Sequence, residues 1–353
     1  MKAPFFTILI DTYNYGEYIE EAVSSALAQD FPAEQREILV VDDGSTDDTQ
    51  ERLRKFEDTI RYLRKANGGQ ASAFNFGFEH ARGEVIALLD ADDVWLPEKL
   101  GRLYEAFERH PTAGMVYHRV HLWSGGNKIS EDTYFIPVSG RIPEDRRALL
   151  QYPMAGTSCL AFRREALQKL LPVPESLRFQ ADAYLTALVI FVAPVAAVPE
   201  FLGKYRLHGA NLFQANAERI SRGQVERKMA MREALLGGIQ NWLQKHGQDP
   251  SSPDLRAYLK QWKKAQESDG FALRAPSRWK YFRHLLDFPW TYGEIMTPRH
   301  RAYSYLRAFA ALFLGYHHLY VLDEVRMKRK RVFASSAEKN LAPEKEKALA
   351  AKV

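Results

Sequence analysis

The first hundred residues alternate short apolar runs with segments in which apolar residues recur every three or four positions. The apolar runs are residues 5–10, 37–41, 60–63 and 85–89. Helical spacing follows them over residues 18–27, 46–56, 71–81 and 97–107. Strands that alternate with helices predict βαβ crossovers and a mainly parallel sheet. Because the strands are apolar throughout, we expect helices on both faces of that sheet.

Two residues in this part of the chain are predicted to mark helix ends. Gly83 follows the segment 71–81, and we expect it to cap the carboxyl end of that helix. Pro97 is expected in the first turn of the next helix, because its missing N–H costs nothing there.

Further along, the pattern changes twice. Residues 114–210 mix strands and helices, with one short strand expected at 195–198. Beyond about residue 215 the spacing is helical. We therefore predict an α/β domain over residues 1–213, a helical region over 214–332 and a disordered charged tail over 333–353.

The composition excludes several classes of protein. With 46% hydrophobic and 26% charged residues in 353, the chain is expected to form a packed core. Its one cysteine excludes a disulfide framework and a thiolate zinc site. The run from Leu185 to Val198 contains Pro194 and is too short for a membrane span of roughly 20 residues. We saw no signal peptide, so the cytoplasm is the expected compartment.

Charge is distributed unevenly along the chain. Residues 1–100 contain 10 Lys and Arg against 20 Asp and Glu, whereas residues 211–353 contain 26 against 14. The acidic first part and the basic last part predict two regions that bind different partners.

Polar groups follow three of the predicted strands. These groups are Asp11 to Asn14, Asp42 to Ser45 and Asp90 to Asp93. Because ligands bind beyond the carboxyl ends of parallel strands, we expect the three groups to meet at one edge of the sheet. That convergence is a prediction from the residue pattern alone.

The chemistry of these strand ends is acidic. The sequence contains no P-loop and no dinucleotide-binding glycine motif. Carboxylates repel a diphosphate directly, but they can hold one through Mg²⁺ or Mn²⁺, which prefer oxygen ligands. Asp90 and Asp92 suit such a site. A turn followed by a helix cap is the alternative interpretation of the same residues.

The order of several motifs resembles that of the family 2 glycosyltransferases. The matching motifs are Thr12-Tyr13-Asn14, Val40 to Asp47, Asn67 to Gln70 with Asn75, Ala81 to Glu84 and Leu89 to Asp93. A weaker likeness continues through Gln180-Ala181-Asp182 and Tyr205 to Asn211. The resemblance implies a GT-A fold: a Rossmann-like, mainly parallel sheet flanked by helices, followed here by a helical region. Residues 1–110 would be its nucleotide-binding half and residues 111–213 its acceptor half.

The resemblance also implies an activity, the inverting transfer of a sugar from a nucleotide diphosphosugar, usually a UDP-sugar. The implied acceptor is a glycan or a lipid-linked molecule in cell-surface polysaccharide synthesis. By position, Asp43 would bind the nucleotide base, Thr12 and Tyr13 would line its pocket, and Asp90 would contact the ribose. Asn14, Gln70 and Asn75, which lie in matching motifs, complete the donor residues that we assign.

The remaining assignments concern the reaction itself. Asp92, with Asp93, would hold Mg²⁺ or Mn²⁺ on the diphosphate, and His208 would assist there. Asp182 would be the catalytic base. A helix cap is the alternative role of this residue, and the two roles can coexist. Asp11 stands where the family usually has proline. The alternative function is a degenerate GT-A domain that binds a nucleotide or a partner without catalysis.

The basic last part of the chain leaves its partner open. Residues 302–325 are rich in aromatic side chains and precede a cluster of Lys and Arg. Residues 300–332 could lie on an anionic membrane, at the inner face. They could also pack on the rest of the protein with a solvated basic end. We expect no nucleic-acid partner, because no such motif accompanies the charge.

Overall fold

The computed structural model describes residues 4–124, 127–131, 137–152, 155–208, 222–292, 298–316 and 318–319. The chain divides into two compact units. The first contains residues 1–121 and 132–270, and the second contains residues 122–131 and 271–353. The predicted boundary at residue 213 and the predicted tail lie outside the described residues. No helix within the described part of the chain is long and apolar enough to cross a membrane.

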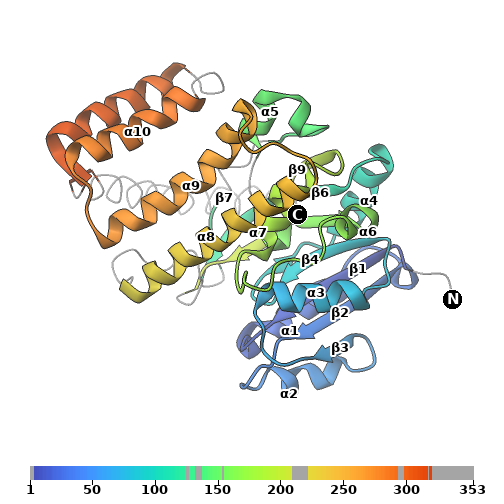
Figure 1. Ribbon diagram of the computed structural model, residues 1–353. Coiled ribbons are helices and arrows are strands. Elements are labelled where there is room, and N and C mark those ends of the chain that lie inside the picture. The colour runs from blue at the N-terminus through green and yellow to red at the C-terminus, as the bar shows by residue number, and fades with distance from the viewer. Residues whose placement is uncertain are drawn as a thin grey trace, which may run out of the picture. The chain divides into compact units, whose positions relative to one another are not determined.

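A mixed sheet forms the centre of the first unit, in the order β3-β2-β1-β4-β8-β6-β9-β5 (Figure 1). The strands are β1 (Phe6–Thr12), β2 (Arg36–Asp42), β3 (Arg61–Arg64), β4 (Val85–Asp90), β5 (Val94–Trp95), β6 (Met115–Ser124), β8 (Leu160–Arg163) and β9 (Val195–Arg206). A further strand, β7 (Asn127–Glu131), belongs to the second unit. The pairs among β1, β2, β3 and β4 are parallel, whereas β8 runs antiparallel to β4 and to β6. The parallel prediction therefore holds for the first four strands, and the sheet turns antiparallel beyond them.

Helices connect these strands as the hydrophobic spacing predicts. They are α1 (Gly16–Leu27), α2 (Thr49–Leu53), α3 (Gln70–His80), α4 (Lys99–Arg109), α5 (Arg146–Gln151), α6 (Arg164–Gln168), α7 (Ala181–Val189), α8 (Arg222–Lys245) and α9 (Pro253–Leu273). The second unit contains α10 (Arg278–Tyr292) and a helix over residues 298–316. The prediction of a helical region after the α/β part is confirmed.

Both faces of the sheet are buried, because successive side chains of each strand point to opposite sides. Ile8 and Ile10 of β1 pack with α1 and α4, through residues such as Val23 and Leu103. Leu9 between them points to the other face and packs with Phe74 of α3. Figure 1 shows α3 lying across that face of β1 and β2. Each continuous apolar run of the sequence thus contributes side chains to two hydrophobic cores, one on each face of the sheet.

The structure corrects three predictions about element ends. Helix α3 ends at His80 with the extended residue Ala81 as its cap, so Gly83 is not a helix cap. Gly83 is required for close approach instead, since a Cβ there would lie 2.3 Å from the Thr7 nitrogen. Helix α4 begins at Lys99, so Pro97 precedes the helix. The strand expected at 195–198 continues to Arg206 as β9, because its pairing with β5 extends it.

The carboxyl ends of β1, β2 and β4 lie side by side. Thr12 pairs with Asp42, and Asp11 pairs with Asp90. The chain leaves β1 toward β2 on one side and returns to β4 on the other, so the strand order reverses at this point. A reversal of this kind opens a crevice at the strand ends. The predicted convergence of the three polar groups is therefore confirmed.

Candidate functional site

Three carboxylates gather at the end of β4. One oxygen from each of Asp90, Asp92 and Asp93 lies within 4.8 Å of the other two. Asp90 ends the strand itself, and Asp92 and Asp93 follow in the tight turn that leads to β5. The Asp93 N–H donates to the Asp90 carbonyl at 3.1 Å, which closes this turn. The local backbone therefore directs several acidic side chains into one small volume.

Neighbouring elements hold this acidic turn in place. The Asp90 N–H donates to the Ser158 hydroxyl oxygen at 3.0 Å. At the end of β9, the Arg206 N–H donates to Asp93 Oδ1 at 2.9 Å, and Arg206 Nε donates to the Asp92 carbonyl at 2.8 Å. Because these contacts come from segments more than 60 residues away, the geometry of the turn depends on the whole sheet.

Burial and mutual repulsion dominate the electrostatics of the site. Burial, followed by the charges of nearby aspartates, raises the pKa of Asp11 to about 7. Burial and the Asp92 charge raise the pKa of Asp93 to about 8, and burial and the Asp11 charge raise the pKa of Asp90 well above its usual value. A cluster that resists ionisation in this way gains most from a nearby cation.

Two buried carboxylate oxygens have no hydrogen-bond partner among the described residues. They are Asp11 Oδ1 and Asp93 Oδ2. An unpaired buried oxygen is costly, so it favours a ligand that can bond it. Together with the three converging carboxylates, these oxygens fit a hard divalent cation, which takes oxygen ligands.

His208 lies beside the acidic turn. Its Nε2 lies 2.9 Å from Asp92 Oδ2. Its ring stacks on Tyr18 with 4.8 Å between the ring centroids and meets Tyr15 edge-on at 6.0 Å. The aromatic contacts fix the ring, so the imidazole is held against the Asp92 carboxylate.

Asp43 lies at the end of β2 with its carboxylate already bonded. Gly69 donates its N–H to Oδ2 at 2.6 Å, Gly68 donates to Oδ1 at 2.9 Å, and the Lys65 ammonium lies 2.8 Å from Oδ1. The Asp43 N–H in turn donates to the Thr12 carbonyl at 2.9 Å. These bonds join the loop before α3 to the strand ends.

The residues after β1 differ in their surroundings. The Thr12 hydroxyl is buried and has no hydrogen-bond partner in the described part of the chain. Tyr13 is 44% exposed. Among the described large hydrophobic side chains of the first unit, it is the most exposed. Asn14 has a positive φ of 59°, and its Oδ1 accepts the Thr46 N–H at 2.7 Å. Asn14 thus holds the 45–47 turn in place, while Thr12 and Tyr13 have groups to offer a ligand.

Asp182 is the second residue of α7 and lies near the same strand ends. Gln70 holds the first turn of this helix in place. Gln70 Oε1 accepts the Ala181 N–H at 3.0 Å, and Gln70 Nε2 lies 3.5 Å from the Thr157 hydroxyl. Asp182 Oδ1 accepts the Ala183 N–H at 2.8 Å. Burial raises the pKa of Asp182, although hydrogen bonds from Ala183 and Thr157 lower it. The Asp182 charge also raises the pKa values of Asp11 and Asp90, so the three carboxylates share one site.

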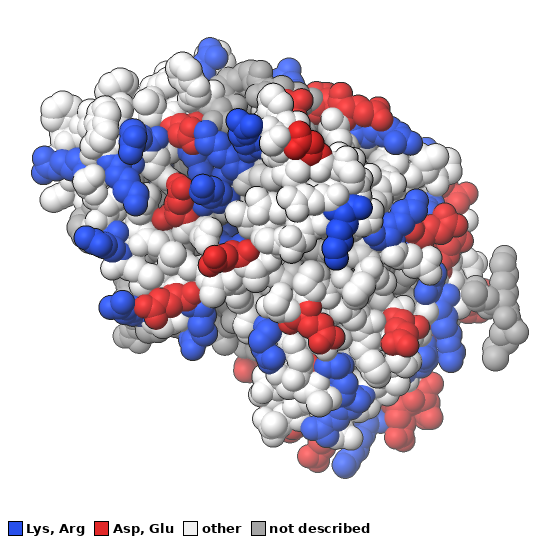
Figure 2. Space-filling model, viewed as in Figure 1, with Lys and Arg blue, Asp and Glu red and all other residues white. Residues whose placement is uncertain are grey.

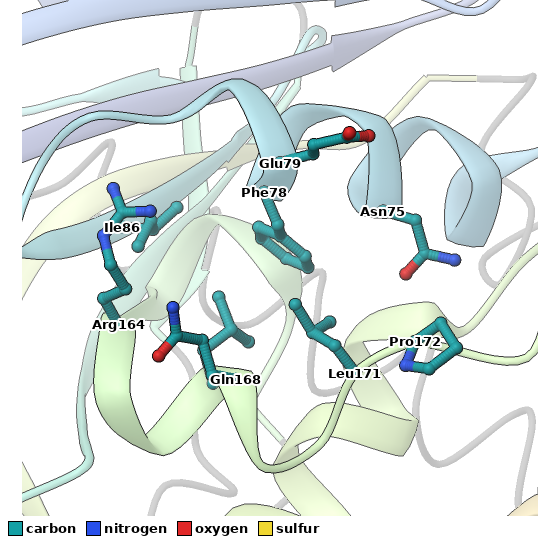
Figure 3. A pocket seen from close by; sticks show the side chains of 9 residues that line it. Asn75, Phe78, Glu79, Ile86, Arg164, Gln168, Leu171 and Pro172 are labelled. Carbon is teal, nitrogen blue, oxygen red and sulfur yellow. The ribbon is translucent and has the colours of Figure 1, made fainter.

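Asn75 lies apart from these residues. Its amide forms two hydrogen bonds with the backbone of Val173, at 2.8 and 2.9 Å. It lines a cavity of about 370 Å³ between α3 and α6, in which Figure 3 shows it facing Pro172. Ile86 near the start of β4 lines the same cavity. Asp90 lies four steps further along the strand than Ile86, or roughly 13 Å at 3.3 Å per residue.

Three residues that support the site received no role in the sequence analysis: Lys99, Ser158 and Arg206, of which only Arg206 lies in a motif that matches the family. Lys99 is completely buried, and its Nζ donates to the Ser158 carbonyl at 2.7 Å and lies 3.5 Å from the Trp95 ring centroid. Burial lowers the pKa of Lys99 well below its usual value. A lysine in the first turn of a helix is usually exposed to solvent, so only the tertiary structure reveals that Lys99 is buried.

Comparison with known proteins agrees with this geometry. Residues 7–171 match the family described as glycosyl transferase family 2. These residues are similar to family 2 glycosyltransferase domains. An uncharacterized glycosyltransferase of Nostoc sp. is 36% identical over 215 residues, which cover 58% of this chain and 65% of the relative. An uncharacterized protein of Mycobacterium tuberculosis is 29% identical over 282 residues, which cover 72% and 78%.

Solved structures share this fold. TarS of S. aureus, in complex with UDP-GlcNAc, has a TM-score of 0.59 at 19% identity, covering 92% of each chain. Mannosyltransferase PcManGT from Pyrobaculum calidifontis, in complex with GDP-Man and Mn²⁺, has a TM-score of 0.52 at 20% identity, covering 95% of this chain and 87% of its own. The expected GT-A fold is confirmed. The chain spans about 65% of the length of the Nostoc relative and of a similar uncharacterized glycosyltransferase of Rickettsia typhi.

Proposed function

We propose that the protein is a metal-dependent, inverting glycosyltransferase of the hexosyltransferase type. The proposed donor is a nucleotide diphosphosugar, and a UDP-sugar is the first choice. The proposed acceptor is a hydroxyl of a glycan or of a lipid-linked molecule in cell-surface polysaccharide synthesis, as the family resemblance implies. The observation that carries the proposal is the acidic turn after β4 together with Asp11 at the end of the neighbouring strand β1. Among the described residues, Asp93 Oδ2 and Asp11 Oδ1 are buried without a hydrogen-bond partner.

The proposed metal site is the turn after β4. Asp92 and Asp93 offer the ligands, and His208 lies against the Asp92 carboxylate. Bound there, Mg²⁺ or Mn²⁺ supplies the positive charge that offsets the negative charge of the diphosphate. The Mn²⁺ in the mannosyltransferase structure supports this choice of ion.

The proposed donor site extends from this turn toward β1 and β2. Asp90 would accept hydrogen bonds from the ribose, and the exposed ring of Tyr13 would pack on the base. Asp43 would accept from the base if the ligand displaced one of its present donors, of which the Lys65 ammonium is the one carried by a side chain. The TarS structures in complex with UDP and UDP-GlcNAc support a uridine nucleotide as the donor.

The proposed base is Asp182, which would accept the proton of the acceptor hydroxyl as the hydroxyl oxygen attacks the anomeric carbon. The bond from that carbon to the diphosphate breaks in the same step, and the nucleoside diphosphate leaves. Burial raises the pKa of this carboxyl, which strengthens it as a proton acceptor. The hydrogen bond from Ala181 to Gln70 keeps the start of α7 at the strand ends, and therefore keeps the carboxylate within the site.

A donor-hydrolysis and transfer assay tests the proposal. The full chain is incubated with Mn²⁺ and a panel of UDP- and GDP-sugars, and nucleotide release is measured with and without EDTA. Asp92→Ala should abolish release. Asp182→Asn should lower turnover by roughly 10²- to 10⁴-fold while calorimetry shows that metal-dependent UDP binding persists. Asp30→Asn, which changes an exposed aspartate, is the matched control.

Two results would contradict the proposal. One is nucleotide release that Asp92→Ala or EDTA leaves intact. The other is metal-dependent nucleotide binding that is unchanged in Asp182→Asn and is accompanied by no turnover on any donor of the panel. The second result would instead support the alternative of a non-catalytic GT-A domain that only binds a nucleotide.

A further inference from the structure

The second unit exposes large apolar side chains. All of the large hydrophobic residues of the described chain that are exposed, apart from Tyr13, lie between residues 279 and 314. They are Trp279, Trp290, Tyr303, Leu306, Phe309, Phe313 and Leu314. Leu306 is 68% exposed and Phe313 is 77% exposed. A concentration of this kind in one small region is unusual for a surface that faces only water.

The helix over residues 298–316 has small residues at its buried positions, namely Ala308, Ala311 and Gly315. Leu312 and Tyr316 on the same helix are partly buried and pack against the core of the second unit. Leu306, Phe309 and Phe313 each precede one of the small residues by two positions. Two residues turn an α-helix by about 200°, so the large side chains lie on the opposite, solvent face. The spacing of three and four between them makes that face one continuous stripe.

Helix α10 continues the same apolar surface. The Trp279 ring lies 5.2 Å from that of Phe282, which lies 5.4 Å from that of Phe309, all measured between centroids. Trp279 and Phe309 are each more than half exposed, whereas Phe282 is buried between them. The exposed faces of the two helices are therefore joined through Phe282, and we call this the aromatic face.

Positive charge surrounds the aromatic face. Residues 271–320 contain seven Lys and Arg but only two Asp and Glu. Arg283 lies one helical turn after Trp279, and Arg299 lies two turns before Leu306, so both are on the exposed sides of their helices. Figure 2 shows Lys and Arg side chains among uncharged ones over α10. In sequence, five more Lys and Arg follow between Arg326 and Arg331.

We propose that the aromatic face binds the surface of a bilayer that contains anionic phospholipids. Trp, Phe and Leu side chains would insert at the boundary between headgroups and acyl chains, while Arg283 and Arg299 would pair with lipid phosphates. The charge complementarity favours this occupant over a second copy of the chain, whose aromatic face would be equally positive. The inference does not depend on glycosyl transfer.

Vesicle sedimentation of the full chain tests it. The protein is mixed with vesicles of phosphatidylcholine alone, or of phosphatidylcholine with phosphatidylglycerol, and the bound fraction is measured without donor or metal. We expect binding to the anionic vesicles that weakens with added salt. Leu306→Ser with Phe313→Ser should lower the partition coefficient at least tenfold, since burial of each such side chain is worth about that factor. Ala302→Ser, on the same helix, is the matched control.

A second pair of substitutions separates charge from apolar contact. Arg283→Gln with Arg299→Gln should weaken binding to anionic vesicles only. All four side chains are exposed, so the variants should melt at the temperature of the unchanged protein. Asp92→Ala should bind vesicles normally, so a failure of the proposed activity would not affect this result.

Either of two outcomes would overturn the inference. One is a bound fraction that is the same with and without anionic lipid, or that the Leu306 and Phe313 substitutions do not change. The other is a concentration-dependent dimer in light scattering that these substitutions abolish, in the absence of vesicle binding. That outcome would assign the aromatic face to a second copy of the chain.

Discussion

Asp11 provides the sharpest quantitative test of the site's electrostatics. Its carboxyl is buried at the end of β1, one oxygen has no hydrogen-bond partner among the described residues, and its strongest charged neighbour is Asp92. The Asp11→Asn substitution keeps the shape of this side chain and removes its charge. We expect the metal-free variant to be more stable than the unchanged protein above neutral pH.

The sign and the size follow from linkage. Folding raises the pKa of Asp11 from 3.8 to about 7. The folded state therefore holds a proton that the unfolded state has lost, and the resulting cost to stability grows from about pH 4 to about pH 7. A shift of about 3 units at 1.36 kcal/mol per unit gives an upper limit of about 4 kcal/mol. Because neighbouring aspartates share this repulsion, we expect a gain of roughly 2 kcal/mol at pH 8.

Urea unfolding in EDTA, followed by tryptophan fluorescence between pH 4.5 and pH 8.5, measures the gain. It should be small at the acidic end, should increase with pH, and should shrink when Mn²⁺ is added, since the cation offsets the same charge. Asp30→Asn, which changes an exposed aspartate, is the matched control. A gain that is independent of pH, or a loss of stability at pH 8, would refute the reasoning.

Three further substitutions separate structural roles from functional ones. Gly83→Ala should cost about 1–3 kcal/mol in thermal unfolding, because its Cβ would meet the Thr7 nitrogen at 2.3 Å in a paired strand. Asn75→Ala should cost about 1–3 kcal/mol in urea unfolding, since the Val173 backbone loses both partners, yet leave UDP affinity in calorimetry unchanged. Gln70→Ala should lower turnover roughly 10- to 100-fold with little change in donor KM, because α7 loses its anchor. A normal turnover rate in the last variant, or a lost UDP affinity in the second, would contradict these roles.

Local residue patterns were sufficient for the first half of the fold. The runs at 5–10, 37–41 and 85–89 became β1, β2 and β4, because a continuous apolar strand has only one stable environment, between two helical layers. The meeting of Asp11, Asp42 and Asp90 followed from the same reasoning, since parallel strands end at a common edge.

Element ends were harder to predict, because long-range contacts decide them. Gly83 is a glycine in the place where a helix cap is expected, yet the structure needs a glycine there for another reason. A Cβ at this position would lie 2.3 Å from the Thr7 nitrogen. Strand β9 was expected to end at Val198, but pairing with β5 carries it to Arg206, whose backbone and side chain then bond the acidic turn. No local pattern contains such information.

The sequence by itself determined which chemical groups meet: oxygen ligands and no thiolates, at the strand ends of an α/β domain. Only the tertiary structure decided what surrounds them. In the folded protein, Asp43 pairs with Lys65 and the loop glycines, and the Asn75 amide bonds the backbone of Val173. Lys99 is buried and donates to the Ser158 carbonyl. The tertiary structure also placed Phe313 outward and Ala311 inward on one helix. Strand ends follow from periodicity along the chain, whereas the partner of each polar group depends on segments that meet only after folding.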